Sequence, residues 1–258
     1  MKNLVKKAIS SFGFELRRKD REKTFCAMDF LDLLRQDPAQ NEVADFIRYV
    51  ALNARRSNSQ LFQDLFVLQT LHEKSAGYFV EFGAADGIFL SNTYLLEREY
   101  GWRGIVAEPS IGWHAPLQKN RGCSVDLRCV WGTSGKTLTF SEALEPEFST
   151  INEFKHSDHN ARHRSNARQY NVTTVSFHDL LSDHNAPSDI DYLSIDTEGS
   201  ELEILKSLDF EKWSFKVITV EHNHTPDYRN ALYSLLSSKG YKRMFSEITR
   251  WDDWYARA

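Results

Sequence analysis

Short apolar runs alternate with helical segments along most of this chain, and that alternation limits the fold more than any other feature of the sequence. The runs with strand character are residues 78–82, 104–107, 124–130, 137–140, 172–175, 192–195 and 217–220. Helical spacing is found at residues 29–34, 42–53, 61–72, 91–100, 178–181, 198–208 and 228–238. This alternation predicts an α/β domain with a mostly parallel sheet and helices on both faces. Residues 241–245 and 250–255 predict a C-terminal antiparallel hairpin.

The bulk composition is that of a folded domain without a nucleic-acid partner. The 258 residues are 41% hydrophobic and 26% charged, and the formal net charge of −4 does not favour binding to nucleic acid. Cys26, Cys123 and Cys129 form no C-x-x-C pair, which indicates a reducing, cytoplasmic setting. No apolar stretch reaches the length of a membrane span, and residues 1–10 lack the apolar centre of a signal peptide.

Two segments differ from the alternating pattern. Residues 1–58 are an N-terminal extension before a domain at residues 59–258, and basic and apolar residues are mixed in its first part. A solvated arm is one interpretation of this start, and peripheral contact with the anionic inner surface of a membrane is the other. Residues 141–170 are polar and long for a plain connection, which predicts an insertion on the substrate side.

The loop after the first predicted strand has the features of a ligand site. In parallel α/β sheets, ligands bind beyond the carboxyl ends of the strands. The strand at residues 79–82 opens into a loop between Gly83 and Gly87, whose small residues allow a ligand to approach the backbone. Glu81 in the strand and Asp86 in the loop suit a cationic ligand better than a phosphate.

The second strand ends at Glu108, where an acid can accept hydrogen bonds from both ribose hydroxyls of a nucleoside. NAD enzymes use an acid in the same place, so Glu108 alone does not select the cofactor. A dinucleotide site needs G-x-G-x-x-G, whereas Gly83 and Gly87 have three residues between them and no third glycine follows. S-adenosylmethionine carries a sulfonium and an amino group but no phosphate, and it fits an acid-lined loop.

Longer blocks of the chain resemble the FkbM-type methyltransferases, over about residues 59–255. The blocks are FVEFGAADGIFLSNTYLLE at residues 79–97, GWRGIVAEPS at 101–110, DYLSIDTEGSELEILKSLDF at 191–210, VEHN at 220–223 and WDDWY at 251–255. The resemblance implies a class I methyltransferase Rossmann-like fold and S-adenosylmethionine as donor. It implies O-methylation of a sugar hydroxyl in a glycan, polysaccharide or glycosylated metabolite. It further implies donor contacts from Glu81, Gly83, Ala84, Asp86, Gly87, Ser91, Asn92, Glu108 and Pro109.

Acidic and imidazole side chains follow two further strands. Asp196 and Glu198 follow the strand at residues 192–195, whereas Glu221 and His222 end the strand at 217–220. A sugar hydroxyl is poorly acidic, so its methylation benefits from a base or a metal ion. One hypothesis makes Asp196, Glu221 and His222 ligands of Mg²⁺ or Mn²⁺. Another makes His222 the general base, oriented by Glu198 or Glu221, and the third gives these side chains a structural role only.

Two other functions compete with methyl transfer. A nicotinamide-dependent oxidoreductase or epimerase predicts a glycine fingerprint and a Tyr-x-x-x-Lys helix, and the sequence has neither. A non-catalytic nucleoside-binding module is expected to have lost the loop glycines or acids, which this chain retains. The leading prediction is therefore an S-adenosylmethionine-dependent O-methyltransferase.

Overall fold

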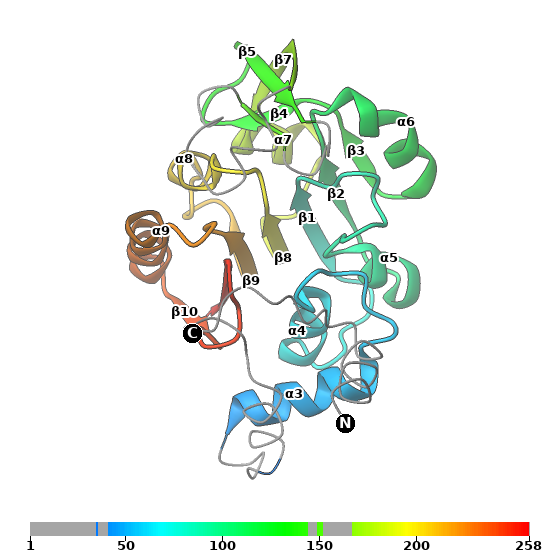
Figure 1. The fold of residues 1–258 in the computed structure, drawn as a ribbon, viewed down its shortest axis with the longest axis vertical. Coiled ribbons are helices and arrows are strands. Elements are labelled where there is room, and N and C mark those ends of the chain that lie inside the picture. Colours follow the sequence, from blue (N-terminus) through cyan, green and yellow to red (C-terminus); the bar gives the residue numbers. More distant parts are fainter. Residues whose placement is uncertain (1–34, 36–40, 144–148, 152–166, 258) are drawn as a thin grey trace, which may run out of the picture.

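A seven-stranded sheet forms the centre of the molecule (Figure 1). The computed structural model describes residue 35 and residues 41–143, 149–151 and 167–257, so the predicted basic arm and the predicted helix at residues 29–34 lie outside the described residues. The sheet has the strand order β10-β11-β9-β8-β1-β2-β3. Its strands are β1 (Tyr78–Phe82), β2 (Arg103–Ala107), β3 (Ser124–Asp126), β8 (Asp189–Ile195), β9 (Ser214–Glu221), β10 (Tyr241–Met244) and β11 (Asp252–Arg257).

The strand order fixes where a ligand can bind. Strands β3, β2, β1, β8 and β9 pair in parallel, whereas β11 is antiparallel to both β9 and β10. The chain moves outward from β1 through β2 to β3 and returns to β8 on the other side of β1. This reversal leaves a crevice at the carboxyl ends of β1 and β8, the usual ligand position in such sheets. Strand β11, inserted between β9 and β10, distinguishes the sheet from the dinucleotide-binding order 3-2-1-4-5-6.

Each face of the sheet carries its own apolar core, because successive side chains of a strand point to opposite faces. On β1, Val80 and Phe82 join one core and Phe79 the other. On β8, Leu193 joins the first core and Tyr192 the second. Burial on both faces explains why these strands are continuous apolar runs in the sequence.

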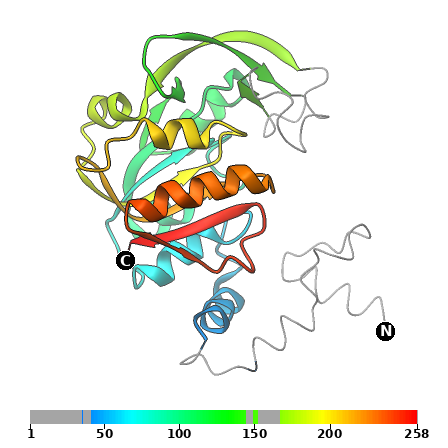
Figure 2. The same cartoon turned by 90° about the vertical axis from the view of Figure 1, so that its left-hand side faces the viewer.

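Helices cover both faces, as predicted. The first core receives side chains from α7 (Phe177–Asp183), α8 (Glu201–Lys206) and α9 (Pro226–Ser238). Figure 2 shows α8, in yellow, beside α9, in orange. The second core receives side chains from α3 (Glu42–Asn53), α4 (Gln63–Thr70), α5 (Tyr94–Tyr100) and α6 (Ile111–Asn120). None of the helices in the described part of the chain is long and apolar enough to cross a membrane.

Helix α6 is absent from the sequence prediction. It contains Gly112 and Pro116, two residues that ordinarily count against a helix, and Leu117 is its only buried residue. With so little of the helix facing the core, the sequence shows no 3.6-residue apolar period. Helix α3, by contrast, has the predicted bounds, because its apolar residues recur with helical spacing and Asn41 caps its N-terminus.

A second sheet of four strands lies beside the first, in the order β4-β7-β5-β6. Its strands are β4 (Cys129–Trp131), β5 (Thr137–Glu142), β6 (Thr150–Ile151) and β7 (Arg168–Ser176). Two predictions change here. The single strand predicted at residues 124–130 is divided between β3 and β4, which belong to different sheets. The ends of the predicted polar insertion form β6 and parts of β5 and β7, and residues 144–148 and 152–166 lie outside the description.

Candidate active site

A pocket opens beyond the carboxyl ends of β1, β2 and β8, at the predicted place. The pocket is open to solvent on one side and is lined by residues of both sheets. The main sheet supplies the polar part of the lining. The second sheet supplies an apolar wall that the sequence pattern did not predict, formed by Cys129, Val130, Phe140 and Ile151.

A glycine is needed at position 83 because the ends of β1 and β8 lie very close together there. Its φ is +78°, and a Cβ atom here would lie 1.8 Å from the carbonyl oxygen of Asp196. The amide of Asp196 in turn donates to the carbonyl of Phe82 at 3.2 Å. Glycine therefore lets the ends of β1 and β8 come together, in addition to the predicted close approach of a ligand.

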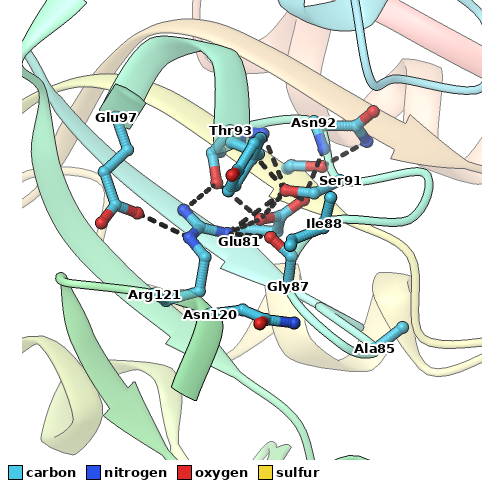
Figure 3. A network of polar contacts seen from close by, with 12 residues as sticks. Glu81, Ala85, Gly87, Ile88, Ser91, Asn92, Thr93, Glu97, Asn120 and Arg121 are labelled. Carbon is cyan, nitrogen blue, oxygen red and sulfur yellow. Dashed lines mark hydrogen bonds and ion pairs between the residues drawn. The ribbon is translucent and has the colours of Figure 1, made fainter. Parts of the chain in front are cut away.

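Glu81 has a full set of partners within the protein (Figure 3). Its buried carboxylate accepts hydrogen bonds from the hydroxyl of Thr93 at 2.6 Å, from the amide of Asn92 at 2.7 Å and from the hydroxyl of Ser91 at 3.0 Å. The guanidinium of Arg121 lies 3.3 Å away. These contacts brace the segment after the glycine loop against β1.

Arg121 supplies the positive charge that the sequence analysis did not assign to Glu81. Its side chain is fully buried and also bonds the carboxylate of Glu97 at 2.5 Å and the hydroxyl of Thr93 at 2.8 Å. A buried acid without a cation would have pointed to a cationic ligand. The structure provides the cation from the residue that follows α6, forty positions along the chain, and no local pattern indicates that contact.

Glu108 links the end of β2 to the glycine loop. One carboxylate oxygen accepts from the amide of Ala85 at 3.0 Å and the other from the amide of Ser110 at 2.8 Å. Burial is the main cause that raises the pKa of Glu108, to about 7. The hydrogen bonds from the two backbone amides oppose that shift. Each oxygen retains a lone pair, so the carboxylate can still accept the two hydroxyls of a ribose.

Asp86 stabilises the loop itself. Its carboxylate accepts from the amides of Ile88 at 2.8 Å and Phe89 at 2.7 Å, an arrangement that closes a turn. Of the predicted donor-contact residues, those that line the pocket are Glu81, Gly83, Asn92, Glu108 and Pro109. Those outside the lining are Ala84, Asp86, Gly87 and Ser91, which hold the loop in shape.

Several lining residues were not assigned to the site from sequence. Gln60 and Gln63 precede or begin α4, Phe89 and Leu90 follow the glycine loop, and Trp113 lies in the first turn of α6. Gln63 lies in the helix predicted at residues 61–72, so the helix itself was expected but its part in the pocket lining was not. No periodicity pointed to Trp113, because α6 itself was not predicted.

Three carboxylates gather where β8 and β9 end. One oxygen from each of Asp196, Glu198 and Glu221 lies within 4.8 Å of the others. Asp196 and Glu198 line the pocket, and Glu198 and Glu221 are buried. The amide nitrogen of Asn223 donates to Glu221 at 2.9 Å and to Glu198 at 3.3 Å, so it bridges two of the acids.

The loop that carries Glu198 is held in an unusual conformation. Glu198 has a φ of +58° and Gly199 a φ of +120°. The carbonyl of Glu198 accepts from the hydroxyl of Thr150 in β6 at 2.9 Å, and the carboxylate of Glu201 accepts from the amides of Thr197 and Gly199. The second sheet and α8 thus hold a left-handed backbone in place beside the pocket, as is common at functional sites.

Burial and mutual repulsion raise the pKa values of two carboxyl groups in this acid cluster. Burial, followed by the charge of Asp252, raises the pKa of Asp196 to about 7. Burial, followed by the charge of Asp196, raises the pKa of Glu221 well above its ordinary value. A proton shared between Asp196 and Glu221 relieves the repulsion, and near neutral pH the cluster is able to accept or release a proton.

His222 is oriented away from this cluster, which disagrees with its hypothesised roles as metal ligand and general base and agrees with the third hypothesis, a structural role. Its Nδ1 accepts from the amide of His224 at 3.1 Å, so its Nε2 carries the hydrogen and donates to the carbonyl of Asp252 at 3.2 Å. His222 is buried outside the pocket lining, and burial is the main cause that lowers its pKa to about 4. Neither ring nitrogen of His222 is free to bind a metal ion or to accept a proton from a substrate. In the cluster of possible metal ligands, the third side chain beside Asp196 and Glu221 is Glu198 and not His222. The physical reason is strand alternation, since Glu221 and His222 point to opposite faces.

The family follows from a comparison of the sequence with known domains. Residues 81–252 match the model of the methyltransferase FkbM domain. The chain belongs to the FkbM methyltransferase family. The match includes the pocket-lining residues from Glu81 to Ser200, whereas Gln60 and Gln63 of the lining precede it. No protein of curated function matches the chain in sequence.

Several solved methyltransferase structures align with the chain at low identity and low TM-score. The S-adenosylhomocysteine-bound methyltransferase PaMTH1 of Podospora anserina is 9% identical with a TM-score of 0.44, and the alignment covers 99% of this chain and 96% of that one. The O-methyltransferase from Bacillus cereus in complex with S-adenosylhomocysteine is 13% identical with a TM-score of 0.41, covering 98% and 97%. The precorrin-6y C5,15-methyltransferase from Geobacter metallireducens is 12% identical with a TM-score of 0.38, covering 70% and 71%. The fold assignment rests on the strand order of this chain, not on these scores.

Proposed function

We propose that this FkbM-family protein transfers a methyl group from S-adenosylmethionine to a hydroxyl of a sugar, in a glycan or a glycosylated metabolite. The observation that carries the proposal is the pocket at the reversal between β1 and β8, with Glu108 at one end and the acids Asp196 and Glu198 at the other. The sugar acceptor rests on the family resemblance of the sequence blocks.

The charges of the pocket support a sulfonium donor over a dinucleotide. The side chains in its described lining that carry a charge when ionised near neutral pH are all carboxylic acids: Glu81, Glu108, Asp196 and Glu198. A pyrophosphate needs amide donors or cations, whereas the positive sulfonium and ammonium groups of S-adenosylmethionine are stabilised beside carboxylates. Glu108 has the position and the free lone pairs for the ribose.

The reaction needs one base and one aligned oxygen. In the proposed step, the acceptor hydroxyl oxygen attacks the methyl carbon of the sulfonium as the carbon–sulfur bond breaks and its electron pair stays on sulfur. The hydroxyl proton passes to the carboxylate of Asp196. The products are a methyl ether, neutral S-adenosylhomocysteine and a protonated Asp196. The pKa of Asp196, raised by burial to about 7, suits this transfer near neutral pH.

The alternative to a general base is a divalent metal ion bound by the same cluster. The ligand set then differs from the sequence hypothesis in one residue, because Glu198 stands in place of His222. The donor set is Asp196, Glu198 and Glu221, all oxygen ligands, which suit Mg²⁺ or Mn²⁺ better than zinc. A bound ion of this kind supplies Lewis acidity to an acceptor oxygen. Asn223 positions two of the three carboxylates whether a proton or an ion balances their charge.

The donor is tested by calorimetric titration of the purified protein with S-adenosylhomocysteine, with NAD⁺ as the control ligand and with either EDTA or Mg²⁺ in the buffer. We expect binding of S-adenosylhomocysteine and none of NAD⁺. Transfer of labelled methyl to a panel of free sugars, sugar nucleotides and glycans then identifies the acceptor. Binding of NAD⁺ alone would refute the proposed donor.

The base is tested by a pair of variants. Asp196→Asn should lower kcat by at least about 100-fold while leaving the affinity for S-adenosylhomocysteine within about threefold, because a general base acts only in the chemical step. His222→Ala should retain turnover as long as it stays folded, because its ring lies outside the pocket lining. If a folded His222→Ala protein lost turnover while Asp196→Asn kept it, His222 and not Asp196 would be the general base.

A further inference from the structure

Phe89 and Gln60 lie at the mouth of the pocket. Both residues line it, yet Phe89 is 58% exposed and Gln60 is exposed as well, so they border the opening to solvent. Their side chains keep apolar surface and polar atoms that can still contact a ligand. An apolar ring that faces water at the entrance of a pocket is typical of a ligand contact.

Three separate segments of the chain form this part of the mouth. Ser59 and Leu90 pair in a parallel bridge, which brings the segment of Gln60 beside the segment of Phe89. The indole nitrogen Nε1 of Trp251 donates to Oε1 of Gln60 at 3.3 Å, so the segment before β11 joins the other two. We call Gln60, Phe89 and Trp251 the aromatic rim.

The contact with Trp251 orients the amide group of Gln60. An indole N–H can only donate, so the amide atom that faces it is the oxygen Oε1. The nitrogen Nε2 is then on the other side of the amide group, and it donates to no group in the part of the chain that the structure describes. Two N–H donors of Gln60 therefore remain at the mouth for oxygen atoms of a ligand.

The two aromatic residues of the rim have different roles. Trp251 packs beside Arg250, whose guanidinium carbon lies 5.7 Å from the centre of the Trp251 ring. The ring of His224 also packs beside Trp251, with 6.0 Å between the ring centres. Trp251 therefore holds the amide of Gln60, whereas Phe89, with more than half of its surface exposed, offers an open ring.

The order of the strands puts the Trp251 side of the rim at the acid end of the pocket. Trp251 precedes Asp252, the first residue of β11, and Asp252 pairs with Glu221 of β9. Strand β11 adjoins β9, whereas β2 with Glu108 lies on the other side of β1 and β8. An acceptor oxygen must lie beside Asp196, the proposed base, so the rest of the acceptor is held by side chains near this end.

We propose that the aromatic rim is the acceptor subsite and that it binds a neutral saccharide. The sugar ring packs on Phe89, and its hydroxyl oxygens accept hydrogen bonds from Nε2 of Gln60. This inference rests on the proposed function, which makes Asp196 the base of a methyl transfer. It adds the residues that hold the acceptor and the class of sugar.

The chemistry of a pyranose matches the rim. One face of the ring presents C–H groups, which pack on the electron-rich face of an aromatic side chain. The edge of the ring presents hydroxyl oxygens, which accept from amide N–H groups. A flat phenol can pack on Phe89 but has only its one hydroxyl for Gln60 and Asp196 together.

The charge of the pocket selects neutral sugars over acidic ones. The side chains of its described lining that carry a charge near neutral pH are all carboxylic acids: Glu81, Glu108, Asp196 and Glu198. A uronic acid brings a further negative charge to this lining, and like charges repel each other strongly where water is partly excluded. Uronic acids should therefore bind more weakly than neutral sugars.

The test detects sugar binding without requiring turnover. Saturation-transfer NMR on the protein loaded with S-adenosylhomocysteine uses methyl glycosides of neutral hexoses, deoxyhexoses and uronic acids, with phenol as the flat control. Neutral glycosides should receive saturation from the protein, whereas uronic acids and phenol should receive little. Glycosides that give a signal are then used as acceptors for labelled methyl.

Variants of the rim connect this binding to its residues. Phe89→Ala and Gln60→Met should each weaken glycoside binding by at least about fivefold and leave the affinity for S-adenosylhomocysteine within about threefold. Trp251→Phe should weaken the glycoside in the wild-type protein but add nothing to Gln60→Met, because it acts through that amide. The control Tyr233→Leu removes an exposed aromatic side chain outside the pocket lining and should change neither ligand.

The outcomes separate this proposal from the function on which it rests. If S-adenosylhomocysteine does not bind, the proposed function is wrong and the acceptor subsite with it. If S-adenosylhomocysteine binds but no neutral glycoside does, or if phenol or the uronic acids bind better, the assignment of a neutral saccharide is wrong. Glycoside binding that is unchanged in Phe89→Ala and Gln60→Met would place the acceptor elsewhere.

Discussion

The acids around this pocket have similar positions at strand ends but different electrostatic partners. Glu81 is neutralised by Arg121, Glu108 accepts two backbone amides, and Asp196 has other acids as neighbours. Their roles follow from those partners: Glu81 braces the loop, Glu108 remains able to bind a ribose, and Asp196 can take a proton. A strand-end acid in a sequence identifies a site, whereas its partner decides its function.

Donor affinity should depend on pH through Glu108. Burial raises its pKa to about 7, and a ribose needs the deprotonated carboxylate as acceptor. Affinity for S-adenosylhomocysteine should therefore rise as the pH increases from about 6 to about 8, because binding favours the deprotonated form. Glu108→Gln should bind about tenfold more weakly, with a flatter pH dependence. Calorimetry at three pH values measures both effects, and an unchanged affinity in the variant would contradict the ribose assignment.

Arg121 should be among the most sensitive residues of the fold. Arg121→Met leaves the buried carboxylate of Glu81 and the partly buried carboxylate of Glu97 without their cation, and we expect the free energy of unfolding to fall by about 3–5 kcal/mol. The matched control Arg56→Met removes an exposed pair with Glu99 and should cost less than about 1 kcal/mol.

Urea denaturation measures both arginine variants. Combining Arg121→Met with Glu81→Gln should recover part of the loss, because the second substitution removes one of the unpaired charges. Equal losses in the Arg121 and Arg56 variants would mean that the buried network contributes little.

At the scale of elements, the site depends on how closely β1 and β8 approach. Gly83→Ala puts a Cβ atom against the Asp196 carbonyl, and neither backbone can move without breaking strand pairing. Gly101→Ala is the matched control, because Gly101 also has a positive φ, +66°, but has open space around it. Gly101→Ala should lower the free energy of unfolding by about 1–2 kcal/mol from backbone strain alone.

We expect the Gly83 variant to lose clearly more stability than the control and to lose donor binding as well. Thermal unfolding and calorimetry in parallel measure the two effects. A Gly83→Ala protein as stable as Gly101→Ala would show that the two strand ends can separate at little cost.

The second sheet is the part of the structure that adds most to the site beyond the sequence prediction. Its side chains form the apolar wall, and Thr150 of β6 bonds the carbonyl of Glu198. Part of this sheet falls in the segment at residues 141–170 that the sequence marked as a polar insertion, and one face of β7 carries exposed residues, Gln169, Asn171 and Thr173. The position of this insertion on the substrate side stays a prediction, and the strands themselves were only partly predicted from the sequence.

At the scale of the whole molecule, stability should fall as the pH rises from about 4 to about 7. Glu108, Asp196 and Asp252 each have a folded-state pKa of about 7, raised mainly by burial. The folded state thus binds their protons more tightly than the unfolded state, and the stability this provides is lost through that range. His222, with a folded pKa of about 4, opposes the trend only below about pH 6.5.

Scanning calorimetry across that pH range measures the decline in Tm, with about 2–4 °C expected for each kcal/mol. Asp252→Asn should lessen the decline and raise Tm at about pH 8, since asparagine can still accept the hydrogen bond from Gln63. A Tm that rises across the range would mean that these acids ionise freely in the folded protein.

The sequence by itself determined the α/β class, the parallel strands, the C-terminal hairpin and the pocket position. These follow from period and spacing: a doubly buried strand must be an apolar run, and parallel strands put Glu81, Glu108, Asp196 and Glu221 at one edge. Only the tertiary structure decided which partner each acid has. Arg121 neutralises Glu81 across forty residues, Glu198 replaces His222 beside Asp196, and Trp113 enters the lining from an unpredicted helix. Such contacts join distant segments, and their energy depends on burial and geometry that a local pattern of residues does not contain.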